Sequence, residues 1–170
     1  MPTSIITRPA TSGDLPEISN LHARVFGPGR YARSAYRVRE GKGLMTRFCR
    51  VAVDQDKIVA ALRMTDVTIG KISGAALLGP IAVDPAHHGQ GFGRKLIAEA
   101  IQSARDAGLR LIVLVGDEPY YGRLGFKLVP HGHITFPGPV NPSRILAIEL
   151  KPGALSQVRG LIVAVQPPQA

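Results

Sequence analysis

Apolar side chains change their spacing several times along the chain, and each change predicts a new element of secondary structure. Residues 4–10 predict a short strand. Residues 15–26 carry apolar side chains at helical spacing behind Asp14, a residue suited to an N-cap, so a first helix is expected there. The glycine-bounded residues 27–43 predict a short second helix held between loops.

Three β-rich segments follow. Residues 50–54 and 58–69 predict two strands of a hairpin, joined by turn-forming residues between them. Residues 73–84 predict a third strand. Pro80 cannot donate to a ladder, and Gly79 has no side chain to pack, so this strand should carry a bulge or a splay at residues 78–80.

The longest predicted helix occupies the segment 89–109, where apolar residues recur at helical spacing from Phe92 and Gly108 is placed as a C-cap glycine. The remaining apolar runs predict strands at residues 110–116, 126–129 and 144–150, with a short helix or turn at 118–125. Strands precede, alternate with and follow helices. The predicted class is therefore α/β, with helices on both faces of one sheet.

Length and composition agree with one folded domain. A chain of 170 residues with 45% hydrophobic and 19% charged residues can bury a sizeable core. We predict a single domain over residues 1–163 and a flexible C-terminal tail over 164–170, where the sequence ends in VQPPQA.

The formal charge of +9 raises the question of nucleic-acid binding. Positive residues are nevertheless spread along the chain. The densest group, between Arg30 and Arg47, has only Tyr31 and Tyr36 among it and forms no stacking array. This distribution argues against nucleic acid and favours a solvated helical face or a pocket wall for an anionic ligand.

Other classes are disfavoured as well. No apolar run exceeds five residues, and the N-terminus lacks a secretory pattern, so we expect neither a membrane span nor secretion. The lone Cys49 fits a reducing, cytoplasmic compartment and is interpreted as a small buried hydrophobe. His87, His131 and His133 lack the partners of a metal site, so no metal is predicted.

The candidate chemistry lies in the string LLGPIAVDPAHHGQGFGRKLI. Its apolar strand ends at Asp84, and Gly89, Gly91 and Gly93 then open the long helix, leaving free N–H groups suited to phosphate. A Walker A loop would need Ser or Thr after Lys95, and the dinucleotide fingerprint would need a glycine at Arg94. Neither motif fits.

The string resembles the pyrophosphate loop of the GNAT superfamily of N-acetyltransferases: Gln or Arg, two residues, Gly, one residue, then Gly or Ala. Gly91 and Gly93 fill the small positions, whereas His88 replaces the Gln or Arg. The preceding LGPIAVDP is similar to the family's fourth strand, and YYGRLGF to its second signature. The resemblance covers the chain to Val163.

This resemblance implies a central mixed, mostly antiparallel sheet in which a splayed pair of parallel strands holds acetyl-CoA. Main-chain groups of Ile81 and Val83 would hold the pantetheine, and the N–H of Ile81 would polarise the thioester carbonyl. His88 would support the loop or donate to a phosphate. The implied cosubstrate-binding set is Ile81, Ala82, Val83, His88, Gly89, Gln90, Gly91, Phe92, Gly93 and Arg94.

The resemblance also implies that Tyr121, four residues before Gly125, donates a proton to the departing thiolate. Packing is the rival role for Tyr121, and Tyr120 is the alternative proton donor. The general base stays open among Asp66, His22 and an ordered water.

The leading hypothesis is an acetyl-CoA-dependent N-acetyltransferase that transfers an acetyl group directly to a primary amine of a small molecule or peptide. The acceptor would lie against the first helix and residues 30–39, whose arginines suit an anionic group. A CoA-binding sensor or regulatory module without significant turnover is the alternative, and a basic nucleic-acid-binding protein is a third. Whether the chain forms a homodimer stays open.

Overall fold

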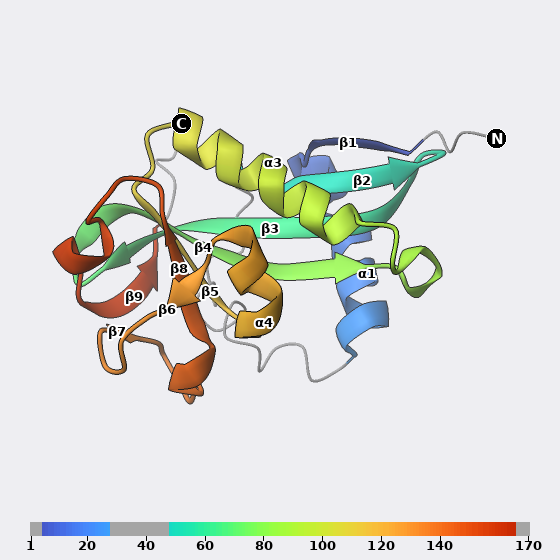
Figure 1. Cartoon of the computed structure of the whole chain (residues 1–170). Coiled ribbons are helices and arrows are strands. Elements are labelled where there is room, and N and C mark those ends of the chain that lie inside the picture. The colour runs from blue at the N-terminus through green and yellow to red at the C-terminus, as the bar shows by residue number, and fades with distance from the viewer. Residues whose placement is uncertain (1–4, 28–47, 166–170) are drawn as a thin grey trace.

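The computed structural model describes residues 5–27 and 48–165 (Figure 1). Its helices are α1 (Leu15–Phe26), α3 (Phe92–Asp106) and α4 (Glu118–Tyr121). Its strands are β1 (Ile6–Pro9), β2 (Arg50–Asp54), β3 (Lys57–Ile69), β4 (Ile72–Val83), β5 (Leu111–Val115), β6 (Lys127–Leu128), β7 (Ile134–Thr135), β8 (Ile145–Glu149) and β9 (Gly160–Ala164). Short 3₁₀ turns lie at Ser12–Asp14, Pro85–His87, Gly122–Leu124, Pro142–Arg144 and Leu155–Gln157.

Within these residues the strands form one nine-stranded sheet. Its main order is β1, β2, β3, β4, β5, β8, β6, and β9 pairs with both β3 and β7. The β4/β5 and β7/β9 pairs are parallel, and the others are antiparallel. The predicted mixed, mostly antiparallel sheet is confirmed.

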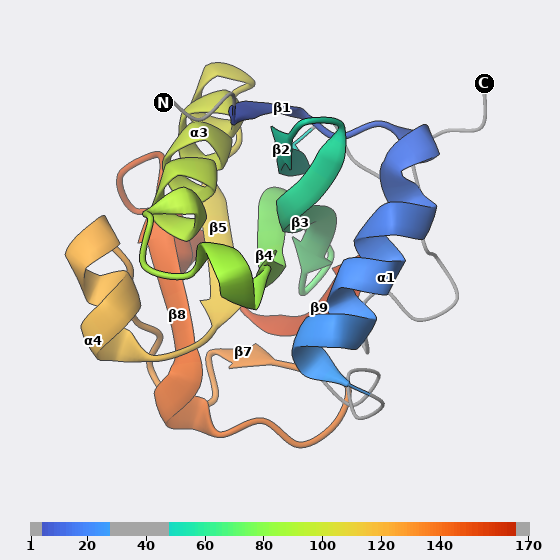
Figure 2. The same cartoon turned by 90° about the vertical axis from the view of Figure 1, so that its right-hand side faces the viewer.

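Helices cover both faces of the sheet, as predicted: α1 lies on one side, and α3 and α4 lie on the other (Figure 2). Leu96 and Ile97 of α3 pack with Leu62 of β3 in one buried cluster. Ile18 and Leu21 of α1 pack in another cluster with residues of β2, β3 and β4. A third cluster joins buried residues of β3, β4, β5, β7, β8 and β9, among them Ile162 of β9.

The predicted irregularity of β4 is present. Leu62 pairs with Ile81 and Met64 pairs with Leu78, so β4 has one more residue than β3 between these two pairs. The extra residue produces a bulge in β4 at Gly79–Pro80. The parallel pairing of β4 with β5 covers only residues 75–77 of β4, so the last part of β4 runs on without β5 beside it. This is the splay that the resemblance implied.

Three details differ from the sequence prediction. Strands β7 and β9 were not predicted, and β6 is shorter than the predicted strand 126–129. Strand β9 runs through Ala164, and Val165 N donates to Asp66 O over 2.8 Å, so the sheet extends past the boundary predicted at residue 163. Its partner β3 lies far away in the sequence, so local sequence patterns cannot predict this pairing. The predicted second helix beyond Gly27, the basic group from Arg30 to Arg47 and the tail residues 166–170 lie outside the described residues.

Candidate active site

The turn from β4 into α3 is held by Asp84. Its Oδ1 accepts from Ala86 N over 3.0 Å, which starts the 3₁₀ turn, and its Oδ2 lies 3.2 Å from Arg24 Nη2 of α1. The hydrogen bond from Ala86 and the Arg24 guanidinium lower the pKa of the Asp84 carboxyl. Gly89 and Gly91 then take φ values of 78° and 85°, a region that favours glycine.

The first turn of α3 begins with amides that have no acceptor inside the helix. Lys95 N donates to Gly91 O over 3.0 Å, which is the first hydrogen bond of the helix. The N–H groups of Phe92, Gly93 and Arg94 therefore have no acceptor inside the helix. Together with the helix dipole they favour an anion at this end.

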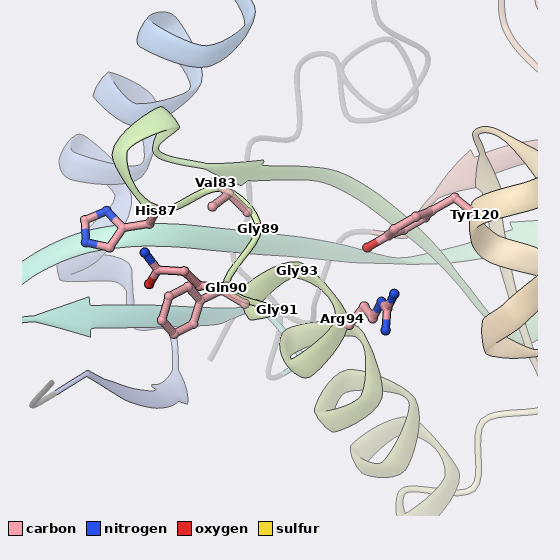
Figure 3. Close-up of a pocket in the computed structure, with 9 residues that line it drawn as sticks. Val83, His87, Gly89, Gln90, Gly91, Gly93, Arg94 and Tyr120 are labelled. Carbon is pink, nitrogen blue, oxygen red and sulfur yellow. The ribbon is translucent and has the colours of Figure 1, made fainter. Parts of the chain in front are cut away.

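Phe92, Gly93 and Arg94, which carry these amides, line a pocket of about 540 Å³ (Figure 3). Its wall brings together seven of the ten residues that the resemblance implied for the cosubstrate: Val83, Gly89, Gln90, Gly91, Phe92, Gly93 and Arg94. Two further lining residues, His87 and Tyr120, were not in that set. Ile81, Ala82 and His88 do not line the pocket.

The two adjacent histidines have different surroundings. His88 Nε2 donates to Val83 O over 3.0 Å, so its ring ties the loop to the end of β4. His87 lies on the pocket wall, with Nε2 3.6 Å from Asp54 Oδ2 and its ring edge-on to Phe92. The contact with Val83 O agrees with a supporting role for His88, and it occupies Nε2 of the ring.

The main chain of β4 also presents groups away from β3. Asp84 N donates to Val59 O over 2.8 Å, so the main-chain groups of Asp84 face β3. Because pairs alternate along an antiparallel ladder, those of Ile81 and Val83 face the opposite way, toward the gap left where β5 ends its pairing. Ala82 belongs to the buried cluster under α1 and carries no exposed group.

The two adjacent tyrosines also have different surroundings. Tyr121 is half-buried, with its ring 6.0 Å from that of Phe126, and a Cβ on Gly116 would come within 2.4 Å of that ring. Tyr121 thus occupies space left by Gly116 at the end of β5. Tyr120 is 41% exposed and lines the pocket.

The candidate bases lie apart from the pocket wall. His22 is 1% exposed and lies in α1 with its ring 5.7 Å from that of Phe26. Asp66 lies in β3 opposite Ala76, beyond the bulge. Within the described residues, no cluster of three potential metal ligands occurs and no helix is long and apolar enough to cross a membrane.

Comparisons with known proteins agree with this geometry. A family model described as an acetyltransferase (GNAT) domain matches residues 7–129. The uncharacterized N-acetyltransferase YhbS of Escherichia coli (strain K12) is 29% identical over 150 residues, which cover 88% of this chain and 89% of that protein.

Two solved structures are similar to the whole fold. The crystal structure of Escherichia coli YhbS in complex with CoA has a TM-score of 0.82 at 27% identity, covering 97% of this chain and 92% of the other. A GNAT family acetyltransferase from Brucella melitensis in complex with acetyl-CoA has a TM-score of 0.62 at 30% identity, covering 86% and 96%.

Proposed function

Because this chain belongs to the GNAT acetyltransferase family and is an acyltransferase, we propose that it uses acetyl-CoA to acetylate a primary amine of a small molecule or peptide. The observation that carries the proposal is that Phe92, Gly93 and Arg94, whose amides have no acceptor inside the helix, lie on the wall of one pocket. Two similar proteins have been solved with CoA or acetyl-CoA bound, which supports the same cosubstrate here.

The residues present fit a CoA species. The pyrophosphate would be held by the amides of α3 and by the nearby charges of Arg94 and Lys95. The outward-facing main-chain groups of Ile81 and the N–H of Val83, whose carbonyl already accepts from His88, would hold the pantetheine along the open part of β4. The left-handed Gly89 and Gly91 shape a loop that the phosphates can approach closely.

Bound acetyl-CoA supplies an activated acetyl group as a thioester. The N–H of Ile81 would donate to the thioester oxygen and stabilise negative charge that develops there. We propose that the acceptor amine attacks the carbonyl carbon directly, the carbon–sulfur bond breaks, and the hydroxyl of Tyr121 gives its proton to the sulfur. The amine proton goes to a base that we leave among Asp66, His22 and an ordered water.

We further propose that the acceptor carries an anionic group, because the sequence places many arginines between residues 30 and 39. A cytoplasmic location is proposed from the lone Cys49, which is 1% exposed. The rival function is a CoA-binding sensor with little turnover, which the replacement of Gln or Arg by His88 motivates.

The test is release of free CoA thiol from acetyl-CoA with a panel of amines, including amino acids, polyamines and peptides. Thiol release that depends on an added amine, with the acetylated amine detected by mass spectrometry, is the expected result. CoA binding without turnover on any amine would favour the sensor. An unfolding temperature that does not rise with any CoA species would contradict both functions.

A further inference from the structure

The pocket wall opposite the glycine loop is formed by a tyrosine from another element. Tyr120 belongs to α4, and its side chain extends from that helix toward the N-terminus of α3 (Figure 3). Its ring is fixed by an edge-to-face contact with Tyr121, at 4.8 Å between centroids and 86° between planes. This contact orients the ring of Tyr120, whose exposed end lies on the pocket wall.

The hydroxyl of Tyr120 lies close to the amides of the helix end. A Cβ built on Gly93 would stand 3.6 Å from this hydroxyl and 3.9 Å from Val83 Cγ2. Gly93, Val83 and Tyr120 thus meet where α3, β4 and α4 come together, and the lack of a side chain on Gly93 leaves the end of α3 bare at this point of the pocket wall. A ligand bound at this part of the wall would be within reach of both the N-terminal amides of α3 and the Tyr120 hydroxyl.

The hydroxyl is available for such a ligand. Among the described residues it makes no hydrogen bond to a protein group, and the only interaction of this side chain there is the ring contact with Tyr121. Phe would provide the same ring contact. The oxygen therefore adds a donor to a pocket whose other groups, the helix amides and Arg94, favour an anion.

We infer that the hydroxyl of Tyr120 donates a hydrogen bond to the pyrophosphate of the bound CoA species. Tyr120 is then a cosubstrate-binding residue that contacts the pyrophosphate from the side opposite the α3 amides. The inference rests on the proposed binding of acetyl-CoA in this pocket. It assigns the two adjacent tyrosines different tasks, binding for Tyr120 and proton donation for Tyr121.

The experiment is isothermal titration of CoA and of 3′-dephospho-CoA into wild type, Tyr120→Phe and the control variant Ser143→Ala. Tyr120→Phe should weaken both ligands by about tenfold, as expected for a lost hydrogen bond to a charged group. An equal loss with both ligands is expected because both carry the pyrophosphate. Ser143→Ala removes an exposed hydroxyl from a residue outside the pocket wall and should bind CoA within about twofold of wild type.

Unfolding temperatures without ligand show whether Tyr120→Phe stays folded, since its ring and the contact with Tyr121 are retained. If wild type binds CoA and Tyr120→Phe binds it equally well, the inference is overturned while the proposed function stands. A loss with CoA that disappears with 3′-dephospho-CoA would also overturn it, because the contact would then be to the 3′-phosphate. Absence of CoA binding to wild type would instead remove the proposed function.

Discussion

His88 Nε2 donates to the main-chain carbonyl of Val83 over 3.0 Å, so the residue that opens the glycine loop is tied to the last residue of β4. The bond closes a turn that also contains Asp84, whose carboxylate caps the 3₁₀ turn between them. The loop geometry therefore depends on a side chain that does not itself line the pocket.

Replacing His88 tests this support. His88→Ala should weaken CoA binding by about fivefold, because one hydrogen bond contributes about 1 kcal/mol to holding the loop. His88→Gln should recover most of the affinity, since its amide can donate to the same carbonyl. Titration calorimetry with CoA measures both variants, and equal affinity of His88→Ala and wild type would show that the loop needs no such tie.

Gly93→Ala should change CoA affinity without lowering the stability of the fold. A Cβ there makes only ordinary contacts with Tyr120 and Val83, and the helical position favours Ala over Gly, so the unliganded unfolding temperature should hold or rise slightly. The same methyl group would fill the space over the helix amides, and CoA affinity should fall at least about tenfold. Calorimetry paired with thermal unfolding checks both halves. A variant that binds CoA normally would place the ligand elsewhere in the pocket.

Much of the fold could be predicted because its signals are local. The bulge in β4 follows from Gly79 and Pro80, and α3 follows from its apolar spacing and its glycine-rich start. Strand β9 was missed because its pairing with β3 joins segments far apart in the chain. Asp14 precedes α1 as predicted, yet its carboxylate accepts from Thr11 N and Arg8 instead of from that helix.

Local sequence signals were also insufficient to predict which single residues line the site. Motif spacing indicated His88 and Tyr121, whereas the pocket is lined by their neighbours His87 and Tyr120. Which member of an adjacent pair faces a pocket depends on the 3₁₀ turn after β4 and on the way α4 packs. The sequence had no local signal for either.

Tyr121→Phe tests the proposed proton donor. Because the phenyl ring keeps its packing against Gly116 and Phe126, the variant should fold and bind CoA like wild type. Its kcat should fall by about 100-fold or more, since the departing thiolate loses its acid. Steady-state kinetics with the best amine from the panel supplies the measurement. An unchanged kcat would leave Tyr121 with a packing role only.

The ion pair between Arg8 and Asp14 predicts a pH dependence of stability. The hydrogen bond from Arg8 holds the pKa of Asp14 at about 2, below its usual value, so the charged carboxylate stabilises the folded state. This contribution is complete above about pH 5 and is lost as the pH falls toward 2.

Asp14→Asn should therefore lower the unfolding temperature at pH 7 by about 2–4 °C, equivalent to about 1 kcal/mol of unfolding free energy. The loss is limited to this size because Arg8 is partly exposed and solvent weakens the ion pair. The difference from wild type should shrink between pH 5 and pH 3. Asp56→Asn, in the exposed turn between β2 and β3, is the control and should not change the unfolding temperature. A difference that stays constant with pH would attribute the loss to packing and not to charge.

Gly70→Ala tests whether β9 is an integral part of the domain. Gly70 has φ of +56°, and a Cβ there would stand 1.8 Å from Arg159 O, immediately before β9. The substitution should displace β9, break the hydrogen bond from Gly70 N to Leu161 O and lower stability by more than about 3 kcal/mol. Gly153→Ala has a similar φ of +79° but open space around the added methyl group, so it should cost only about 1 kcal/mol. Denaturant unfolding compares the two variants, and equal losses would mean that β9 adapts to the added methyl group.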